Sequence, residues 1–226
     1  MKPVSWPCPA VDGGTSDEFA LVFDDGRVAR LLVVPALFDE AHRLRRFTVE
    51  VMRRLDGAGI DSFLPDLPGT NESLAPLPAQ TFQSWHNAIA AAARYFAATH
   101  VLAMRGGALL LQDDLPGWIY APIKGASLLR QMLRARIVSA REAGREETVA
   151  SLTELAQRDG IELAGYPVSA KLFNDINAST AFSHDRLMVV EQDMIGDSAL
   201  WMRAEPGEDA AQADALAAVV AVGVKS

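Results

Sequence analysis

The stretch of sequence that decides the fold is residues 99–111, THVLAMRGGALLL. Residues 101–104 are apolar and predict a short buried strand. Arg105 and two glycines follow, and residues 108–111 form a second apolar run. Glycines between two apolar runs are typical of a sharp turn. The stretch therefore predicts a strand, a tight turn and the start of a helix.

The residues at this turn resemble the nucleophile elbow of the α/β hydrolases. That motif reads G-x-S-x-G, and small residues flank its serine because the strained backbone lies close to a neighbouring strand and helix. The five positions here are Ala103, Met104, Arg105, Gly106 and Gly107, so an arginine replaces the serine. A guanidinium stays protonated and cannot attack a carbonyl carbon, but its fork of N–H donors can hold an anion. The resemblance predicts a hydrolase scaffold whose usual chemistry has been removed or replaced.

Length and composition limit the class of protein. The chain has 226 residues, half of them hydrophobic, and a formal net charge of −8. These values predict a single domain over residues 1–226, and the negative charge argues against nucleic acid and anionic membranes as partners. Cys8 is the only cysteine, and no stretch approaches the roughly 20 apolar residues of a membrane span or the core of a signal peptide. We therefore expect a cytoplasmic protein without membrane insertion.

Strand-like runs alternate with helical patterns, which predicts an α/β protein with a mostly parallel sheet and helices on both faces. Residues 18–23 and 28–35 predict an antiparallel hairpin that turns at residues 24–26. The later strands are expected at residues 60–64, 101–104, 118–122, 187–191 and 199–203, with a short strand or extended link at 161–164. The helices are expected at residues 39–55, 82–96, 146–158, 169–176 and 209–224, and in a segment that Ser127 caps.

Ligands of an open α/β sheet bind beyond the carboxyl ends of its strands. Four predicted loops lie there: residues 35–46, 65–73, 105–107 and 122–127. Their polar side chains suit an anionic or hydroxyl-rich ligand. These side chains are Asp39, Glu40, His42, Arg43, Arg45, Arg46, Asp66, Asn71, Glu72, Arg105 and Lys124.

The rest of a serine hydrolase triad is incomplete. The acid and the histidine should follow the nucleophile in that order, and Asp193 is a candidate acid. The histidine is expected at residues 201–209, where none occurs, and the last histidine, His184, precedes the strand at residues 187–191. Because the four histidines are scattered and lack metal-ligand spacing, the sequence predicts no metal site and no cofactor.

Several segments together are similar to the exosortase A system-associated hydrolases. Asp39, Glu40, His42, Arg45 and Arg46 fall at that family's acidic and basic positions, with His42 in place of an asparagine. The resemblance implies the α/β-hydrolase fold, a hydrolase label and association with exopolysaccharide production and exosortase-linked protein sorting. The segments are PALFDEAHRLRRFTVEVMRRL (residues 35–55), LPDLPGTNES (64–73), VLAMRGGALLL (101–111), YAPIKGASLLRQMLRARIVSA (120–140) and ELAGYPVSAKL (162–172).

Three hypotheses of function follow, and a homo-oligomer is compatible with each. In the first, which the sequence favours over the two alternatives, Arg105 with Glu40 and nearby arginines binds the carboxylate or phosphate of a small acyl or saccharide-derived ligand. In the second, a water activated by Glu40, Asp66 or His42 hydrolyses a substrate. In the third, the chain is a non-catalytic interaction subunit, and Arg105 is buried in a closed ion pair with no pocket above the turn. For ligand binding, the further candidates are Leu37, Asp39, Arg45, Arg46, Gly106, Gly107 and Lys124, with backbone N–H groups near Leu37 and Gly106 as oxyanion donors.

Overall fold

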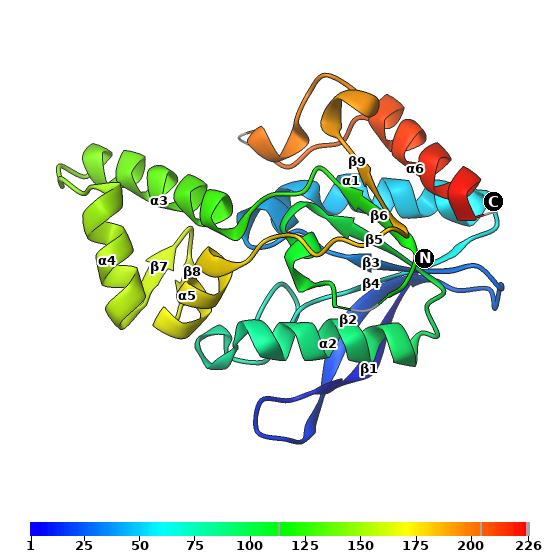
Figure 1. The fold of residues 1–226 in the computed structure, drawn as a ribbon, viewed down its shortest axis with the longest axis horizontal. Helices are drawn as coiled ribbons and strands as arrows, with labels where there is room; N and C mark the ends of the chain where they lie inside the picture. The colour runs from blue at the N-terminus through cyan, green and yellow to red at the C-terminus, as the bar shows by residue number, and fades with distance from the viewer. Residues whose placement is uncertain (113, 204, 225–226) are drawn as a thin grey trace.

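A computed structural model describes residues 1–112, 114–203 and 205–224. Its centre is a seven-stranded sheet in which only the second strand runs opposite to the others (Figure 1). The strands in chain order are β1 (Lys2–Pro9), β2 (Thr15–Phe23), β3 (Arg30–Val34), β4 (Asp61–Pro65), β5 (His100–Met104), β6 (Gly117–Tyr120) and β9 (Leu187–Val190). Their order across the sheet is β1-β2-β4-β3-β5-β6-β9. The predicted, mostly parallel α/β sheet is confirmed.

Helices cover both faces of this sheet (Figure 1). The helices α1 (Asp39–Gly57) and α6 (Ala210–Val224) pack on one face, and α2 (Phe82–Tyr95) packs on the other. Strand β3 contributes to both cores, because Leu31 and Val33 point to one face and Leu32 and Val34 to the other. Within the part of the chain that the structure describes, no helix has the combination of length and apolarity needed to cross a bilayer.

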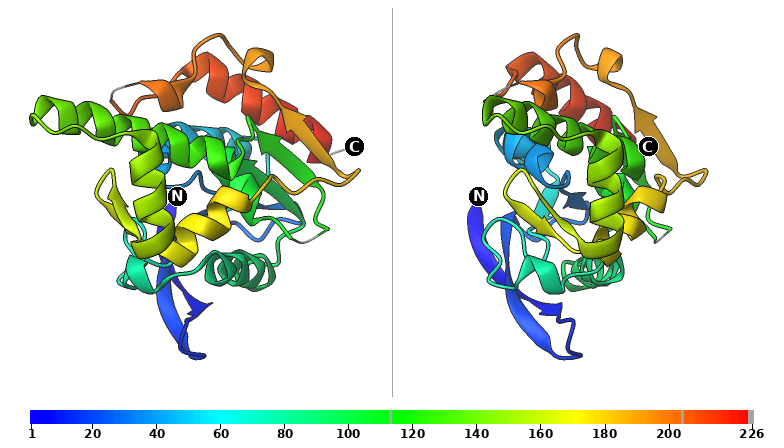
Figure 2. Two further views of the ribbon diagram at one scale, coloured as in Figure 1. Left: turned by 60° about the vertical axis from the view of Figure 1, so that its left-hand side comes forward. Right: turned by 90° about the vertical axis from the view of Figure 1, so that its left-hand side faces the viewer.

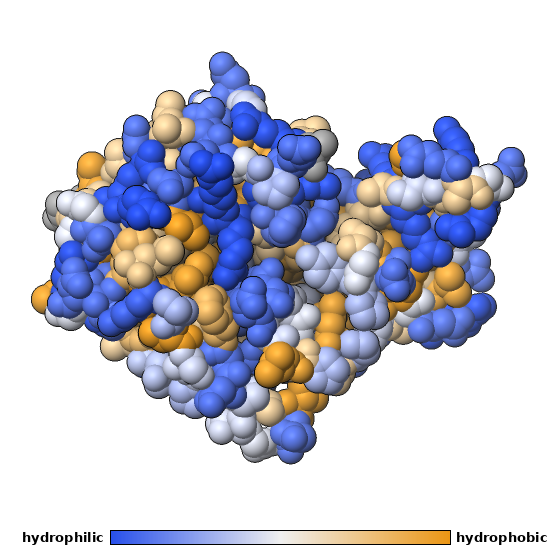
Figure 3. All heavy atoms as spheres, turned by 180° about the vertical axis from the view of Figure 1, so that it is seen from behind, coloured by the Kyte–Doolittle hydropathy of each residue, from blue (hydrophilic) through white to orange (hydrophobic). Residues whose placement is uncertain are grey.

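A second group of elements, which we call the cap, is inserted between β6 and β9. It stands beside the sheet, and its longest helix extends well beyond the body of the molecule (Figure 2). From behind, the cap is a separate lobe with a largely hydrophilic outer surface (Figure 3). The cap consists of α3 (Gly125–Glu142), α4 (Val149–Asp159), the hairpin strands β7 (Ile161–Leu163) and β8 (Tyr166–Val168), and α5 (Ala170–Ala178).

The predicted hairpin between residues 18–23 and 28–35 is wrong. Strand β2 pairs antiparallel with β1 and β4, whereas β3 lies on the far side of β4. The connection from β2 to β3 therefore passes the amino end of β4, where the buried Asp61 accepts hydrogen bonds from the backbone N–H groups of Asp25 and Arg27 at 3.1 and 2.8 Å. A carboxylate from a later strand thus decides the path of this connection.

Three smaller predictions also differ from the structure. After the tight turn the chain forms a 3₁₀ helix, η2 (Arg105–Leu110), and the described residues between it and β6 form no α-helix. Helix α3 begins at Gly125 with Lys124 as its cap residue, so Ser127 lies inside the helix. The strand expected at residues 199–203 is a short 3₁₀ helix, η4 (Leu200–Met202). Two further 3₁₀ turns are η1 (Leu77–Ala79) and η3 (Gln192–Met194).

Candidate functional site

The turn after β5 has the backbone strain of a nucleophile elbow. Arg105 is the first residue after this strand, and its φ of 52° is a left-handed conformation that residues with a side chain rarely adopt. Residues with similar φ follow β3 and β6, namely Phe38 at 56° and Ala121 at 45°. Three adjacent parallel strands therefore end in strained turns at one edge of the sheet, the edge at which α/β proteins bind ligands.

Arg105 does not point into an open site. Its side chain is 6% exposed and forms a two-pronged ion pair with Glu40, which is 3% exposed. Nε donates to Oε2 of Glu40 at 3.1 Å, and Nη2 donates to Oε1 at 2.8 Å. Nη1 donates to the carbonyl of Ala121 at 2.8 Å. Burial raises the pKa of the Glu40 carboxyl, and the hydrogen bonds from Arg105 act against that rise.

A tryptophan covers the guanidinium. The ring of Trp201, on η4, lies 3.9 Å from Cζ of Arg105, a cation–π contact. Arg43 holds this tryptophan in place by donating from Nη1 to its carbonyl at 2.8 Å, and Arg43 also pairs with Asp39 at 3.1 Å. Trp201 lies within residues 201–209, the stretch in which a hydrolase histidine is expected. This stretch therefore places an aromatic side chain, and not a histidine, against the side chain of the residue in the nucleophile position.

The glycines of the elbow are packed tightly against β3 and its exit. A Cβ added to Gly107 would lie 2.4 Å from the carbonyl oxygen of Pro35, closer than any side chain allows. A Cβ on Gly106 would lie 3.2 Å from Cγ of Leu37 and 3.3 Å from Cδ2 of Leu128. The close approach expected for the small flanks of the elbow is therefore present, and two leucine side chains pack directly against Gly106.

Asp66 and Arg45 form a separate cluster that organises the loop after β4. Nη1 of Arg45 donates to Oδ1 of the buried Asp66 at 2.7 Å, and Nδ2 of Asn71 donates to the same oxygen at 3.1 Å. The backbone N–H of Glu72 donates to Oδ2 at 3.3 Å. Asp66 is therefore engaged in holding its own loop.

The remaining candidate residues lie nearer the surface. His42 and Lys124 are exposed, and Arg46 pairs with Glu208 at 2.5 Å on the outside of α1. Asp193, the candidate acid, is exposed on η3. The structure thus brings Arg105, Glu40 and Asp39 together with Trp201 and Ala121, two residues that the sequence did not single out. Trp201 could have been noticed in the sequence, because it lies in the stretch at residues 201–209 where the histidine was expected.

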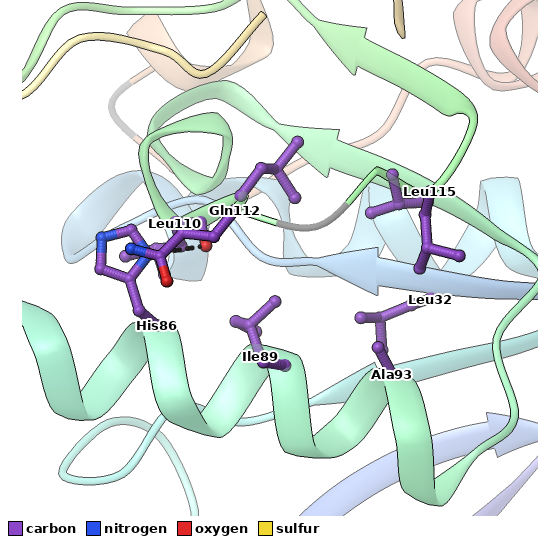
Figure 4. Close-up of a pocket in the computed structure, with 10 residues that line it drawn as sticks. Leu32, His86, Ile89, Ala93, Leu110, Gln112 and Leu115 are labelled. Atoms are coloured by element: carbon purple, nitrogen blue, oxygen red, sulfur yellow. Dashed lines mark hydrogen bonds between the residues drawn. The ribbon is translucent and has the colours of Figure 1, made fainter. Parts of the chain in front are cut away.

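A small cavity lies between α2 and the chain that follows η2 (Figure 4). Its volume is about 10 Å³, which is room for about one water molecule. Nδ1 of His86 donates to the carbonyl of Leu110 at 2.9 Å beside it, and burial lowers the pKa of this histidine. Among residues 1–112, 114–203 and 205–224, no three His, Cys, Asp or Glu side chains are grouped so that they could hold a metal ion.

Comparison with solved structures shows the fold. A crystal structure of an Agrobacterium vitis S4 protein, provisionally assigned as a hydrolase, is similar over 84% of this chain and 89% of its own length, with a TM-score of 0.50 and 11% identity. The alpha/beta hydrolase GrgF from Penicillium sp. sh18 is similar over 80% and 74%, with a TM-score of 0.48 and 13% identity. A thermophilic esterase from Thermogutta terrifontis is similar over 71% and 55%, with a TM-score of 0.42 and 14% identity.

No protein-family model matches the chain, and no curated protein matches it in sequence. The fold assignment therefore depends on the first structural similarity together with the strand order and the strained turn after β5. On these observations the chain has the α/β-hydrolase fold, as the resemblance of the elbow predicted.

Proposed function

We propose that this protein is an α/β-hydrolase-fold chain without serine hydrolase chemistry, which acts as an interaction subunit. The observation that carries the proposal is the ion pair at the elbow. The residue in the nucleophile position is a buried arginine, and its three nitrogens are bonded to Glu40 and Ala121. An ion pair closed in this way is what the interaction hypothesis requires.

Ligand binding at Arg105 is less favourable because the ligand would have to displace Glu40. Separating a buried pair leaves an uncompensated charge and costs about 3–5 kcal/mol. An anionic ligand would also have to move Trp201 away from the guanidinium face. Its binding energy would need to repay both costs before any affinity appeared.

Hydrolysis by an activated water is also less well supported. A general base must lie within hydrogen-bond reach of the water that it activates. Glu40 is 3% exposed and Asp66 1% exposed. Both carboxylates are held by neighbouring donors, Glu40 by Arg105 and Asp66 by Arg45, Asn71 and Glu72. His42 is exposed on α1, and no described residue gives it the orienting partner that a catalytic histidine needs.

The setting of this interaction role is the exopolysaccharide system that the family resemblance implies. The support is the set of similar segments, above all the acidic and basic residues from Asp39 to Arg46 and the arginine-bearing elbow. In the organism of origin, deletion of the gene is expected to lower exopolysaccharide output. A copy carrying Arg94→Ala, an exposed position on α2 outside the candidate residues, should restore it, and unchanged output after the deletion would contradict this part of the proposal.

The direct test is an activity screen with short acyl esters, thioesters and glycosides. The parent protein and Arg105→Ala, both verified as folded by circular dichroism, should show no turnover above the buffer rate. Arg105→Ser should also remain inactive, because no histidine base accompanies the new hydroxyl. Turnover in the parent that disappears in Arg105→Ala would overturn the proposal and make Arg105 part of a catalytic site.

A further inference from the structure

A stripe of arginines runs along the exposed side of α3, the long helix of the cap. Arg130, Arg134 and Arg141 are exposed, and none of their side chains forms a hydrogen bond or ion pair within the part of the chain that the structure describes. Steps of four and seven residues bring all three to one side of a helix. Val138, which is 59% exposed, lies between Arg134 and Arg141 on that side. We call these four residues the basic stripe.

This stripe contrasts with the arginines of the body, most of which are neutralised within the chain. On α1, Arg43, Arg45 and Arg54 each pair with a carboxylate at 3.1 Å or less. Helix α3 also projects from the body and has solvent around its outer side (Figure 2). Unpaired charges on a projecting helix are available to a partner, and desolvating them requires carboxylates on that partner.

An open hollow of opposite charge follows β9. Its volume is about 510 Å³, and its lining includes Glu191, Asp193 and Asp197. These carboxylates have no side-chain partner among the described residues, and Met194 between them is 55% exposed. The carboxylates of the hollow and the exposed side chain of Met194, which is their neighbour along the chain, form a patch of opposite charge to the basic stripe. We call these four residues the acidic hollow.

We propose that the basic stripe of one copy of this chain docks into the acidic hollow of a second copy, and that the reverse contact forms at the same time. Figures 1 and 2 place α3 and the connection after β9 toward the same side of the molecule. Two patches on one side of a chain can meet reciprocally under a two-fold rotation, which gives a closed dimer. In each of the two reciprocal contacts, Val138 of one copy packs against Met194 of the other. The surrounding charges fix how the two surfaces align.

This inference is independent of the elbow, so it can fail while the proposed function holds. The occupant is a second copy rather than another acidic molecule because both complementary surfaces are present on one chain. Their apolar centres also match, a feature that a polysaccharide or nucleic acid would not use. The net charge of −8 keeps other faces apart and limits association to this pair of surfaces.

The test is sedimentation velocity of the full chain over a range of protein and salt concentrations. The parent should be a dimer that dissociates as salt is raised, because exposed charges are screened. Arg130→Glu with Arg134→Glu and Arg141→Glu should weaken association at least about 100-fold. Glu191→Lys with Asp193→Lys and Asp197→Lys should do the same. Arg94→Glu with Lys2→Glu changes exposed, unpaired charges elsewhere and should leave the dimer intact.

An equimolar mixture of the two charge-reversed variants is the decisive experiment. Each stripe then faces a hollow of opposite charge again, so the mixture should form a heterodimer although each variant alone is a monomer. A parent that is monomeric at every concentration would overturn the proposal. A dimer that survives either charge reversal would overturn it as well, because the interface would then lie elsewhere.

Discussion

Arginine occurs in two opposite settings in this protein. At the elbow, Arg105 is buried, bonded at all three nitrogens and covered by Trp201. On the cap, the side chains of Arg130, Arg134 and Arg141 are exposed and have no partner among residues 1–112, 114–203 and 205–224. The same side chain therefore fixes backbone geometry in one region and is available for recognition in the other, and burial of the charge decides which.

The largest expected effect comes from leaving the buried arginine without its partner. Glu40→Ala should lower the free energy of unfolding by about 3–5 kcal/mol, because a guanidinium would remain buried without a counter-charge. Arg134→Ala on the cap should change it by no more than about 0.5 kcal/mol. Urea denaturation of both variants measures the difference. Equal losses of unfolding free energy in the two variants would contradict the contrast between the buried and the exposed arginines.

A smaller effect should come from the backbone at the elbow. Gly107→Ala places a Cβ 2.4 Å from the Pro35 carbonyl oxygen, whereas in Gly106→Ala the nearest atoms are ends of the Leu37 and Leu128 side chains. Overpacking typically costs about 1–3 kcal/mol, so we expect Gly107→Ala near the upper end and Gly106→Ala near the lower end. Thermal unfolding of the two variants tests this ranking, and a larger loss at Gly106 would contradict the described packing.

The smallest effect extends the comparison from arginine to histidine. Burial lowers the pKa of His86, which lacks a carboxylate partner, and burial acts in the same direction on His100. The unfolded state then binds more protons, so stability is full above the unfolded pKa of about 6.5 and falls as the pH drops through it. His86→Gln should flatten this fall in urea titrations between about pH 7.5 and 5.5.

A substitution without a titratable group is the matched control for His86. Ile89→Val lies on the same helix beside the same small cavity. Ile89→Val should lower the free energy of unfolding by a similar amount at every pH and leave its dependence on pH unchanged. If the stability of His86→Gln depended on pH in the same way as that of the parent, the fall in stability at low pH would not come from His86.

Local patterns predicted most of the framework of this fold. The helical spacing of Phe82, Trp85 and Ile89 located α2, and the apolar runs located β4 to β6, because these signals depend on neighbouring residues alone. The hairpin prediction failed because Asp61, more than thirty residues along the chain, draws the connection after β2 past β4. Pairing between distant segments is not encoded in the turn residues that suggested a hairpin.

The candidate site divides in the same way. The strained turn and the small flanks of Arg105 follow from a local motif. The closure by Trp201 depends on the path of the chain after β9, where a weak strand was expected and a 3₁₀ helix formed instead. Burial of Arg105, the property that separates it from the arginines of the cap, therefore became apparent only with the tertiary structure.

The central claim is that Arg105 is committed to Glu40, and a double-mutant cycle tests it most directly. The free energies of unfolding of the parent, Glu40→Ala, Arg105→Ala and the double variant give the coupling between the two side chains. Alanine keeps a Cβ at position 105, so the strain of the positive φ is retained throughout the cycle. We predict a coupling of at least about 2 kcal/mol, with the double variant more stable than Glu40→Ala. A coupling below about 0.5 kcal/mol would mean that the two residues act independently, and it would contradict the account of a locked elbow.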